Sequence, residues 1–232
     1  MQYYWLNKEN NKNLIVFFCG WSFDYKPFKR LDCLNYDVLF VYDYCDINNI
    51  KNLTSYHLNV LSSLLQYKTS TLITWSMGVY VGYLLKNVLP NFSKKIAING
   101  TPYPIHDEWG IPIKTFDLTL KYVDTGLQGK FQKNLFKYPK DYGKYLENPV
   151  ERTIGNQKAE LIALNDFIKN KKINYEKFYD YAIISDMDKI IPTRNQKSCW
   201  ETLDTPYKIL DSGHFPFFEF KSWEDIVNAS KP

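Results

Sequence analysis

The stretch Leu72–Gly82 reads LITWSMGVYVG, and it is the most informative part of the sequence about the architecture. Its first four residues form an apolar run typical of a buried strand, and the residues after Ser76 favour a helix. A strand that leads directly into a serine and then a helix is the context of a nucleophile elbow. Glycine usually stands two residues before and after that serine, whereas this chain has Thr74 and Gly78. We therefore predict Ser76 as a nucleophile, with a helix N-cap as its alternative role.

Further apolar runs flank this stretch and are separated by segments with helical character. The runs lie at 14–18, 36–42, 95–99, 179–184 and 206–210, and the helical segments at 53–67, 78–88 and 219–229. Strands that alternate with helices predict an α/β fold with a mostly parallel central sheet and helices on both faces.

Residues 105–177 break this alternation. The region contains no apolar run of the strand type, is rich in Lys, Tyr and Asn, and favours several short amphipathic helices. It is too long for an ordinary loop. We predict a helical cap inserted at 105–177 into a core made of 1–104 and 178–232, with a plain set of surface helices as the alternative.

Composition excludes several classes of protein. The chain has 232 residues, of which 45% are hydrophobic and 17% aromatic, as expected for a globular protein. No apolar run is long enough to span a membrane, and the first residues do not resemble a secretory signal. The four cysteines have no metal-ligand spacing and suggest reduced thiols, so we expect a cytoplasmic protein. The net charge is +4, but only Arg30, Arg152 and Arg194 among 29 basic residues are arginines, which argues against nucleic-acid recognition.

A nucleophilic serine needs a base, and the chain has only three histidines. In α/β-hydrolases the order along the chain is nucleophile, acid, histidine. His57 precedes Ser76, and His106 follows the wrong strand. His214 follows the last predicted strand and is the predicted base. Gly213 is expected to give its loop a backbone conformation that other residues avoid.

Two acidic residues follow the strand predicted at 179–184, namely Asp186 and Asp188. The acid of a triad accepts the imidazole N–H and stabilises the imidazolium. Asp188 is preferred because apolar residues and Pro192 follow it, as in many α/β-hydrolases. Asp186 remains the second choice, and both residues have an alternative role as solvated turn residues.

An oxyanion hole requires two preorganised N–H donors. The backbone N–H of Met77, directly after the nucleophile, is the first candidate. The loop after the strand at 14–18 supplies the second, and Trp21 is the best-placed residue there. Cys19 in the same loop is expected to be a small buried residue rather than a thiol nucleophile.

Four segments together resemble the BioG family of α/β-hydrolases, which are pimeloyl-[acyl-carrier protein] methyl ester esterases. The segments are Phe18–Asp24 (FCGWSFD), Thr74–Gly78 (TWSMG), Ala97–Ile105 (AINGTPYPI) and Ser212–Phe218 (SGHFPFF). The similarity extends from about Leu14 to Trp223, and the motifs are specific when they occur in this order.

The resemblance implies a serine esterase of biotin biosynthesis that needs no cofactor and no metal. It implies Ser76, His214 and Asp188 as catalytic residues and the N–H groups of Trp21 and Met77 as the oxyanion hole. Its partner would be an acidic acyl carrier protein, with no nucleic acid or membrane involved, and a monomer is the simplest expectation. Phe116, Tyr122 and Phe131 are candidates for lining the acyl channel, and their alternative role is to pack the cap onto the sheet. Lys121 and Arg152 are candidates for contacts with the carrier, and their alternative role is to form part of a solvated lysine-rich face. Another esterase or thioesterase, or a non-catalytic binding protein of this fold, is the rival function.

Overall fold

A computed structural model of the chain describes residues 1–49, 55–170 and 175–230. Within these residues a seven-stranded sheet has the order β1-β3-β2-β4-β5-β6-β7. Only β1 runs antiparallel to its neighbour, β3, and the other pairs are parallel. The apolar runs of the sequence correctly predict β2 to β7; β1 has half-buried residues and no such run. The strands are β1 (Gln2–Asn7), β2 (Asn13–Phe18), β3 (Tyr36–Tyr42), β4 (Thr69–Trp75), β5 (Lys94–Ile98), β6 (Tyr181–Ser185) and β7 (Tyr207–Leu210).

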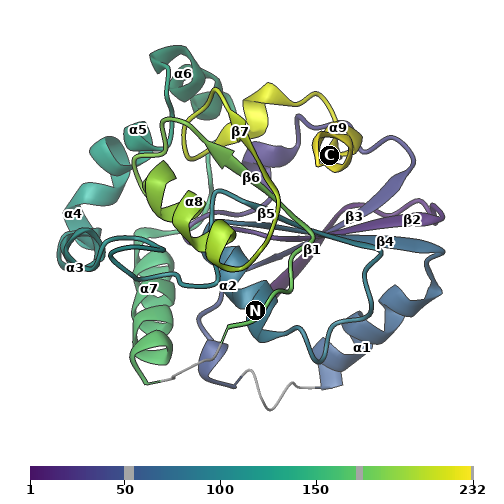
Figure 1. Cartoon of the computed structure of the whole chain (residues 1–232). Helices are drawn as coiled ribbons and strands as arrows, with labels where there is room; N and C mark the ends of the chain where they lie inside the picture. Colours follow the sequence, from purple (N-terminus) through teal and green to yellow (C-terminus); the bar gives the residue numbers. More distant parts are fainter. Residues whose placement is uncertain (50–54, 171–174, 231–232) are drawn as a thin grey trace.

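Helices cover both faces of the sheet because successive residues of each buried strand point to opposite sides. Leu72 of β4 belongs to the apolar cluster shared with α2 and α7, whereas Ile73 belongs to the cluster shared with α9. Figure 1 shows α9 above the sheet and α1, α2 and α7 below it. This arrangement confirms the predicted layers. The helices named here are α1 (Ser55–Ser63), α2 (Met77–Leu84), α7 (Ile154–Lys169) and α9 (Trp223–Ala229).

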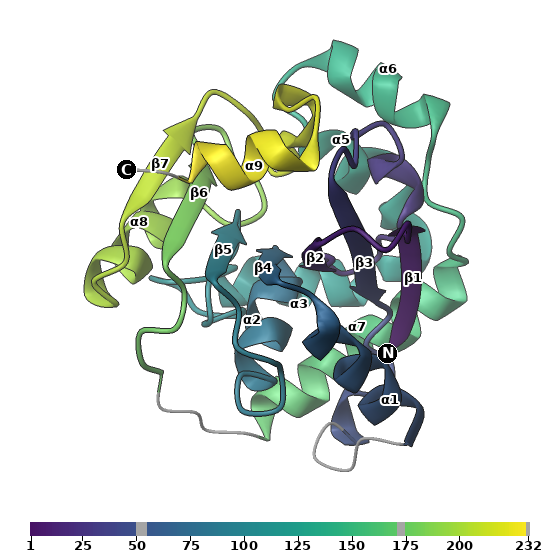
Figure 2. The same cartoon turned by 90° about the vertical axis from the view of Figure 1, so that its right-hand side faces the viewer.

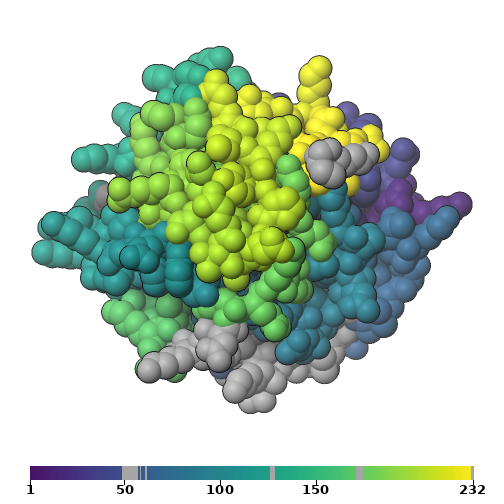
Figure 3. Space-filling model, in the orientation of Figure 1, coloured from purple at the N-terminus to yellow at the C-terminus, as the bar shows by residue number. Residues whose placement is uncertain are grey.

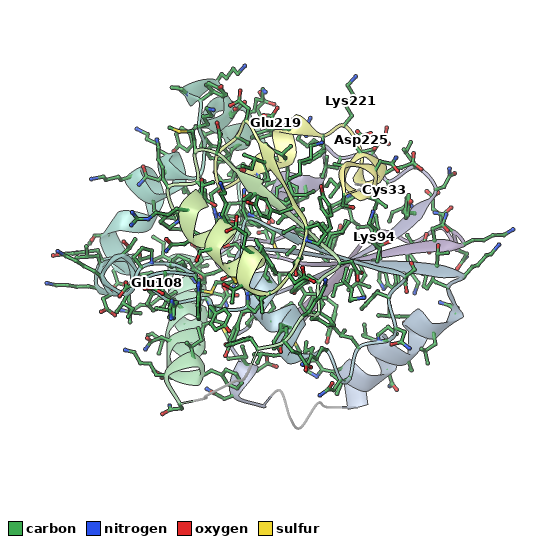
Figure 4. The ribbon with its side chains drawn as sticks, viewed as in Figure 1. Cys33, Lys94, Glu108, Glu219, Lys221 and Asp225 are labelled. Carbon is green, nitrogen blue, oxygen red and sulfur yellow. The ribbon has the colours of Figure 1, made fainter. Side chains whose placement is uncertain are left out.

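The last helix, α9, begins at a capping box. Ser222 accepts a hydrogen bond from the N–H of Asp225, whose carboxylate accepts one from the N–H of Ser222. These bonds satisfy backbone donors that the first turn of a helix otherwise leaves unpaired. Figure 4 shows Asp225 at the start of α9 and the Lys221 side chain pointing away from the protein.

The chain between β5 and β6 forms helices, as the sequence predicts. Figure 2 shows α5 and α6 at the end of the molecule toward which β4 and β5 point. The division into a core and a cap at 105–177 remains a prediction. In the described part of the chain, no helix is long and apolar enough to span a bilayer. The helices are α3 (Ile113–Lys121), α4 (Val123–Gly126), α5 (Gln132–Asn134), α6 (Pro139–Glu147) and α7.

Candidate active site

Ser76 stands in a sharp turn between β4 and α2. Its backbone has φ 56° and ψ −126°, a conformation that costs free energy for a residue with a side chain. A hydrogen bond of 3.0 Å from its N–H to the oxygen of Ile98 holds the turn. The turn needs Gly78, because a Cβ atom there would lie 2.2 Å from the carbonyl oxygen of Phe18. The Ser76 side chain makes no capping hydrogen bond to α2, so the N-cap role has no support in the structure.

The threonine that replaces the first glycine of the elbow pattern is accommodated by a glycine further along the chain. Thr74 is fully buried at the end of β4. Its methyl group faces Gly82 of α2, where a Cβ atom would lie only 2.8 Å from the Thr74 Cγ2 atom. The close approach of strand and helix, normally achieved by the glycine before the serine, is achieved here by the pair Thr74 and Gly82.

A chain of hydrogen bonds links Ser76, His214 and Asp188. The Nε2 atom of His214 lies 2.9 Å from the Ser76 hydroxyl oxygen, and its Nδ1 atom lies 2.8 Å from Asp188 Oδ2. All three residues are buried, although they come from three loops far apart in the sequence. In this geometry one ring nitrogen can accept the serine proton while the carboxylate fixes the other.

The His214 loop is anchored through its backbone. The carbonyl oxygen of His214 accepts hydrogen bonds from Trp75 Nε1 (2.9 Å) and Asn99 Nδ2 (3.0 Å). The sequence predicts that Gly213 adopts a backbone conformation that other residues avoid. This prediction is wrong, because Gly213 is not among the residues with positive φ. It is needed for space instead, since a Cβ atom would lie 2.6 Å from the backbone nitrogen of Lys137.

Asp186 and Asp188 occupy different environments. The exposed Asp186 carboxylate accepts hydrogen bonds from Lys137 Nζ (2.9 and 3.1 Å) and from the N–H of Ser212. Lys137 also pairs with Asp211. Asp188 is buried against the imidazole of His214. The geometry therefore favours Asp188 over Asp186 as the partner of His214.

The loop that carries Trp21 is held by helix α7 and by Arg152, two residues before that helix. Trp21 Nε1 donates to the carbonyl oxygen of Gln157 (2.8 Å), and the N–H of Ser22 donates to Glu160 Oε2 (3.1 Å). Arg152 reaches the Phe23 carbonyl oxygen and forms an ion pair of 2.7 Å with Glu160. The N–H of Met77 is the first of α2 and thus has no acceptor within the helix.

A cavity of about 110 Å³ opens onto the serine. Its wall is mostly apolar, and the only lysine among the described residues that line it is Lys189, an exposed residue directly after Asp188. Helix α3 contributes Phe116 between two threonines, α7 contributes Leu161, and Phe131 comes from the segment before α5. The cavity is lined by Trp21, Phe23, Trp75, Ser76, Met77, Ile111, Thr115, Phe116, Thr119, Phe131, Asn134, Leu135, Leu161, Lys189, Ile190 and His214.

The structure brings only some of the predicted substrate contacts to this cavity. Phe116 and Phe131 line it together with Trp21 and Met77. Tyr122 is half exposed and lies outside it, with the Lys121 ammonium 5.2 Å from the centre of its ring. The expectation that Arg152 contacts the carrier is wrong, because its guanidinium is buried in ion pairs with Glu160 and Asp43.

Cys19 is buried at the end of β2. Burial, followed by the nearby Asp24 and Glu160 carboxylates, raises the pKa of its thiol well above the ordinary range. A thiol in this state is protonated at neutral pH and is a poor nucleophile. The structure agrees with the expected passive role.

Sequence reasoning missed three residues at this site. Gln196 of α8 (Thr193–Thr202) hydrogen-bonds Asp188, Glu160 holds the loop of Trp21, and Lys189 lines the cavity. Gln196 and Glu160 belong to no sequence motif. Their partners are distant in the sequence or depend on helix packing, so only the folded structure reveals these contacts. The spacing of Thr115, Phe116 and Thr119 on one helical face could have indicated that α3 covers a cavity.

Comparisons with known proteins place this geometry in a family. The family described as "Pimeloyl-ACP methyl esterase BioG" matches residues 1–226. The chain belongs to the BioG family. A crystal structure of BioG from Haemophilus influenzae is similar, with a TM-score of 0.83 and 26% identity, and the match covers 97% of this chain and 99% of that chain. An esterase from Exiguobacterium antarcticum shares the fold, with a TM-score of 0.61, 18% identity, and coverage of 96% and 93%.

A curated relative from Bacteroides fragilis carries a different name, malonyl-[acyl-carrier protein] O-methyltransferase. It is 29% identical over 217 residues, which are 88% of this chain and 40% of that protein. The chain thus spans well under half the length of this relative. Together with the parallel sheet, the BioG match and the structural neighbours confirm the predicted α/β-hydrolase fold.

Proposed function

We propose that this protein is a serine esterase that hydrolyses the methyl ester of pimeloyl-[acyl-carrier protein] methyl ester in biotin biosynthesis. The observation that carries the proposal is the His214 ring, which lies within hydrogen-bond distance of both Ser76 and Asp188 at the wall of an apolar cavity. This arrangement suits acyl transfer through a covalent intermediate. The description of the BioG family supports the choice of substrate.

The proposed reaction begins when the Ser76 oxygen attacks the carbonyl carbon of the methyl ester and its proton passes to His214 Nε2. The N–H groups of Trp21 and Met77 bind the oxyanion that forms. The tetrahedral intermediate expels methanol, which takes the proton from His214 as it leaves. A pimeloyl ester of Ser76 remains, still joined to the carrier protein through its other end.

Water then enters from the side vacated by methanol. His214 takes a proton from the water as its oxygen attacks the acyl carbon, and the same proton is returned to the Ser76 oxygen when the ester breaks. The product is pimeloyl-[acyl-carrier protein] with a free carboxyl group. Throughout the cycle the Asp188 carboxylate stabilises the imidazolium form of His214.

The methyltransferase relative supports a methyl ester as the reactive bond. An O-methyltransferase that acts on a carrier-bound malonyl group forms a methyl ester, which is the type of bond that the proposed reaction removes. The segment similar to this chain covers 40% of that protein, and more than half of it lies outside the match. The Ser76 site has the geometry of a hydrolase, so we assign hydrolysis rather than methylation to this chain.

An acidic carrier protein needs lysines that are not already held in ion pairs. Lys137, Lys144 and Lys158 form ion pairs with neighbouring carboxylates. Lys114 and Lys121 of α3 form no ion pair among the described residues and lie on the outer side of the helix whose inner side lines the cavity. We propose these two lysines as contacts for the carrier, chiefly raising the association rate.

The decisive test compares the wild-type protein with Ser76→Ala on the carrier-linked methyl ester. We expect the variant to lose at least about 10³-fold in kcat, because the nucleophile is absent while binding is retained. Mass spectrometry should find a free carboxyl group still attached to the carrier. Release of the carrier thiol would identify a thioesterase instead, and equal rates for both proteins would overturn the mechanism.

The two aspartates provide a second test. Asp188→Asn should lower kcat by about 10⁴-fold, because the amide no longer stabilises the imidazolium or fixes the ring tautomer. Asp186→Asn, which alters the contact with Lys137, should leave kcat within a few-fold of wild type. The reverse result would make Asp186 the acid.

A further inference from the structure

The Gln196 side chain is fully buried next to the acid of the proposed triad. Its Nε2 atom lies 2.9 Å from Asp188 Oδ2 and 2.9 Å from the carbonyl oxygen of Ile191. Its Oε1 atom has no hydrogen-bond partner among the described residues. Since both neighbours are acceptors, only the nitrogen of the amide can face them, and this fixes the amide orientation. Gln196 does not line the cavity.

The Asp188 carboxylate has a complete set of donors. Oδ1 accepts from the N–H groups of Ile190 (2.8 Å) and Ile191 (2.9 Å). Oδ2 accepts from Gln196 and lies 2.8 Å from His214 Nδ1. The Gln196 amide and the His214 ring therefore both hydrogen-bond to Asp188 Oδ2, and both are stabilised by the negative charge on that oxygen. A donor placed there also prevents rotation of the carboxylate away from the ring.

We propose that Gln196 is a positioning residue of the active site, whose amide holds Asp188 Oδ2 on the His214 ring and takes up part of the carboxylate charge. This inference rests on the proposed function of Ser76, His214 and Asp188. Without the amide donor, the charge on Oδ2 acts more fully on the ring and favours imidazolium. The acid side of the pH profile of activity should then move to higher pH.

Among the described residues, few other charged groups lie near His214, and they stay unchanged when Gln196 is replaced. Lys189 lines the same cavity, and its ammonium opposes the imidazolium. The exposed cluster of Lys137, Asp186 and Asp211 lies beside the loop of Gly213. Helices α2 and α3 contribute no charged side chain to the cavity. A change in the pH profile would thus report on the contact between Gln196 and Asp188.

The test measures kcat/KM for a short-chain ester as a function of pH, because the acid limb of this profile reports the ionisation of the free enzyme. For Gln196→Met, which keeps the size but removes the donor, we expect the acid limb to move up by about half a pH unit or more. The matched control is Asn195→Leu. Asn195 is the neighbouring buried amide of α8 and donates to the carbonyl oxygens of Asp107 and Gly110. Both changes remove two buried hydrogen bonds, but only the first should shift the acid limb.

A second variant decides the matter if Gln196→Met does not fold. Gln196→Val also removes the donor but leaves a smaller side chain than methionine against Asp188, so the acid limb should again move up by about half a pH unit or more. A Ser76-dependent esterase whose acid limb stays in place in the Gln196 variants would overturn the positioning role alone. Ester hydrolysis that does not depend on Ser76 in the otherwise unchanged protein would overturn the proposed function together with it.

Discussion

Helices α3 and α7 lie in the same segment between β5 and β6, and both reach the cavity, yet they are attached to the core differently. The attachment of α7 is polar and buried. Glu160 accepts hydrogen bonds from the N–H groups of Ser22 and Tyr44 and pairs with Arg152, which also contacts Asp43. These contacts join the end of β3 and the loop after β2 to one helix.

Helix α3 has no comparable anchor. Phe116 packs inward, while the described side chains of α3 make hydrogen bonds only within the helix itself. Ile113 and Leu118 are about half exposed on its outer side, which they share with Lys114, Asp117 and Lys121. In Figure 3 this segment, in dark teal, forms an outer flank of the molecule. The comparison indicates that α7 belongs to the framework that shapes the oxyanion loop, whereas α3 is a cover that meets the substrate.

The largest expected effect tests the anchor of α7. Arg152→Met removes the cation from a fully buried carboxylate and should reduce the free energy of unfolding by about 3–5 kcal/mol. Urea denaturation measures this change. The control is Lys158→Met, which breaks an exposed ion pair of the same helix with Asp124 and should cost at most about 1 kcal/mol. Equal losses would show that α7 is not anchored through Arg152.

The same variant should have a characteristic pH dependence. Burial raises the pKa of the Glu160 carboxyl above its ordinary value, and Arg152 opposes that rise. In Arg152→Met the folded-state pKa should rise further, so the folded protein holds a proton that the unfolded chain releases. The contribution of Glu160 to the stability of this variant should therefore be full below the unfolded pKa of about 4.3 and should be lost as the pH rises from there to the folded value. A stability deficit relative to wild type that stays constant between about pH 4 and about pH 7 would contradict this.

The contrast between the two helices also explains how much the sequence could predict. Ser76, Asp188 and His214 follow strands whose carboxyl ends meet at one edge of a parallel sheet, so their order along the chain is enough to bring them together. Arg152 was assigned to the surface because a charge in a lysine-rich segment does not reveal which side of a helix it occupies. Its partner Asp43 lies more than a hundred residues away, and no local pattern joins them.

Gln196 and Thr74 illustrate the same limit. The contact of Gln196 with Asp188 depends on how α8 packs against the loop after β6, which periodicity does not specify. Thr74 departs from the elbow pattern, and its compensation by Gly82 appears only when the strand and the helix are in contact. A functional residue that directly follows a strand can be predicted from the order of strands and loops. A residue whose role depends on which helix packs against it cannot.

A substitution on the inner side of α3 should weaken the use of the acyl chain in binding. Phe116→Ala removes apolar surface from the cavity wall and should lower kcat/KM for a pimeloyl methyl ester by about 10- to 100-fold. The loss should be smaller for methyl acetate, whose acyl chain is too short to use that surface. Leu118→Ala, on the exposed side of the same helix, is the control and should leave both rates near wild type. Equal losses for both esters would remove Phe116 from the acyl site.

The smallest expected effect concerns the outer side of α3. The double substitution Lys114→Glu and Lys121→Glu should lower kcat/KM for the carrier-linked ester several-fold, and added salt should reduce the difference because exposed charges are screened. The free methyl ester should be hydrolysed at the wild-type rate. The control double substitution, Lys12→Glu and Lys68→Glu, changes the net charge equally but lies before β2 and β4, at the sheet edge opposite Ser76. If both pairs slow the carrier-linked reaction alike, the effect is one of net charge; if only the α3 pair does, this helix is where the carrier approaches.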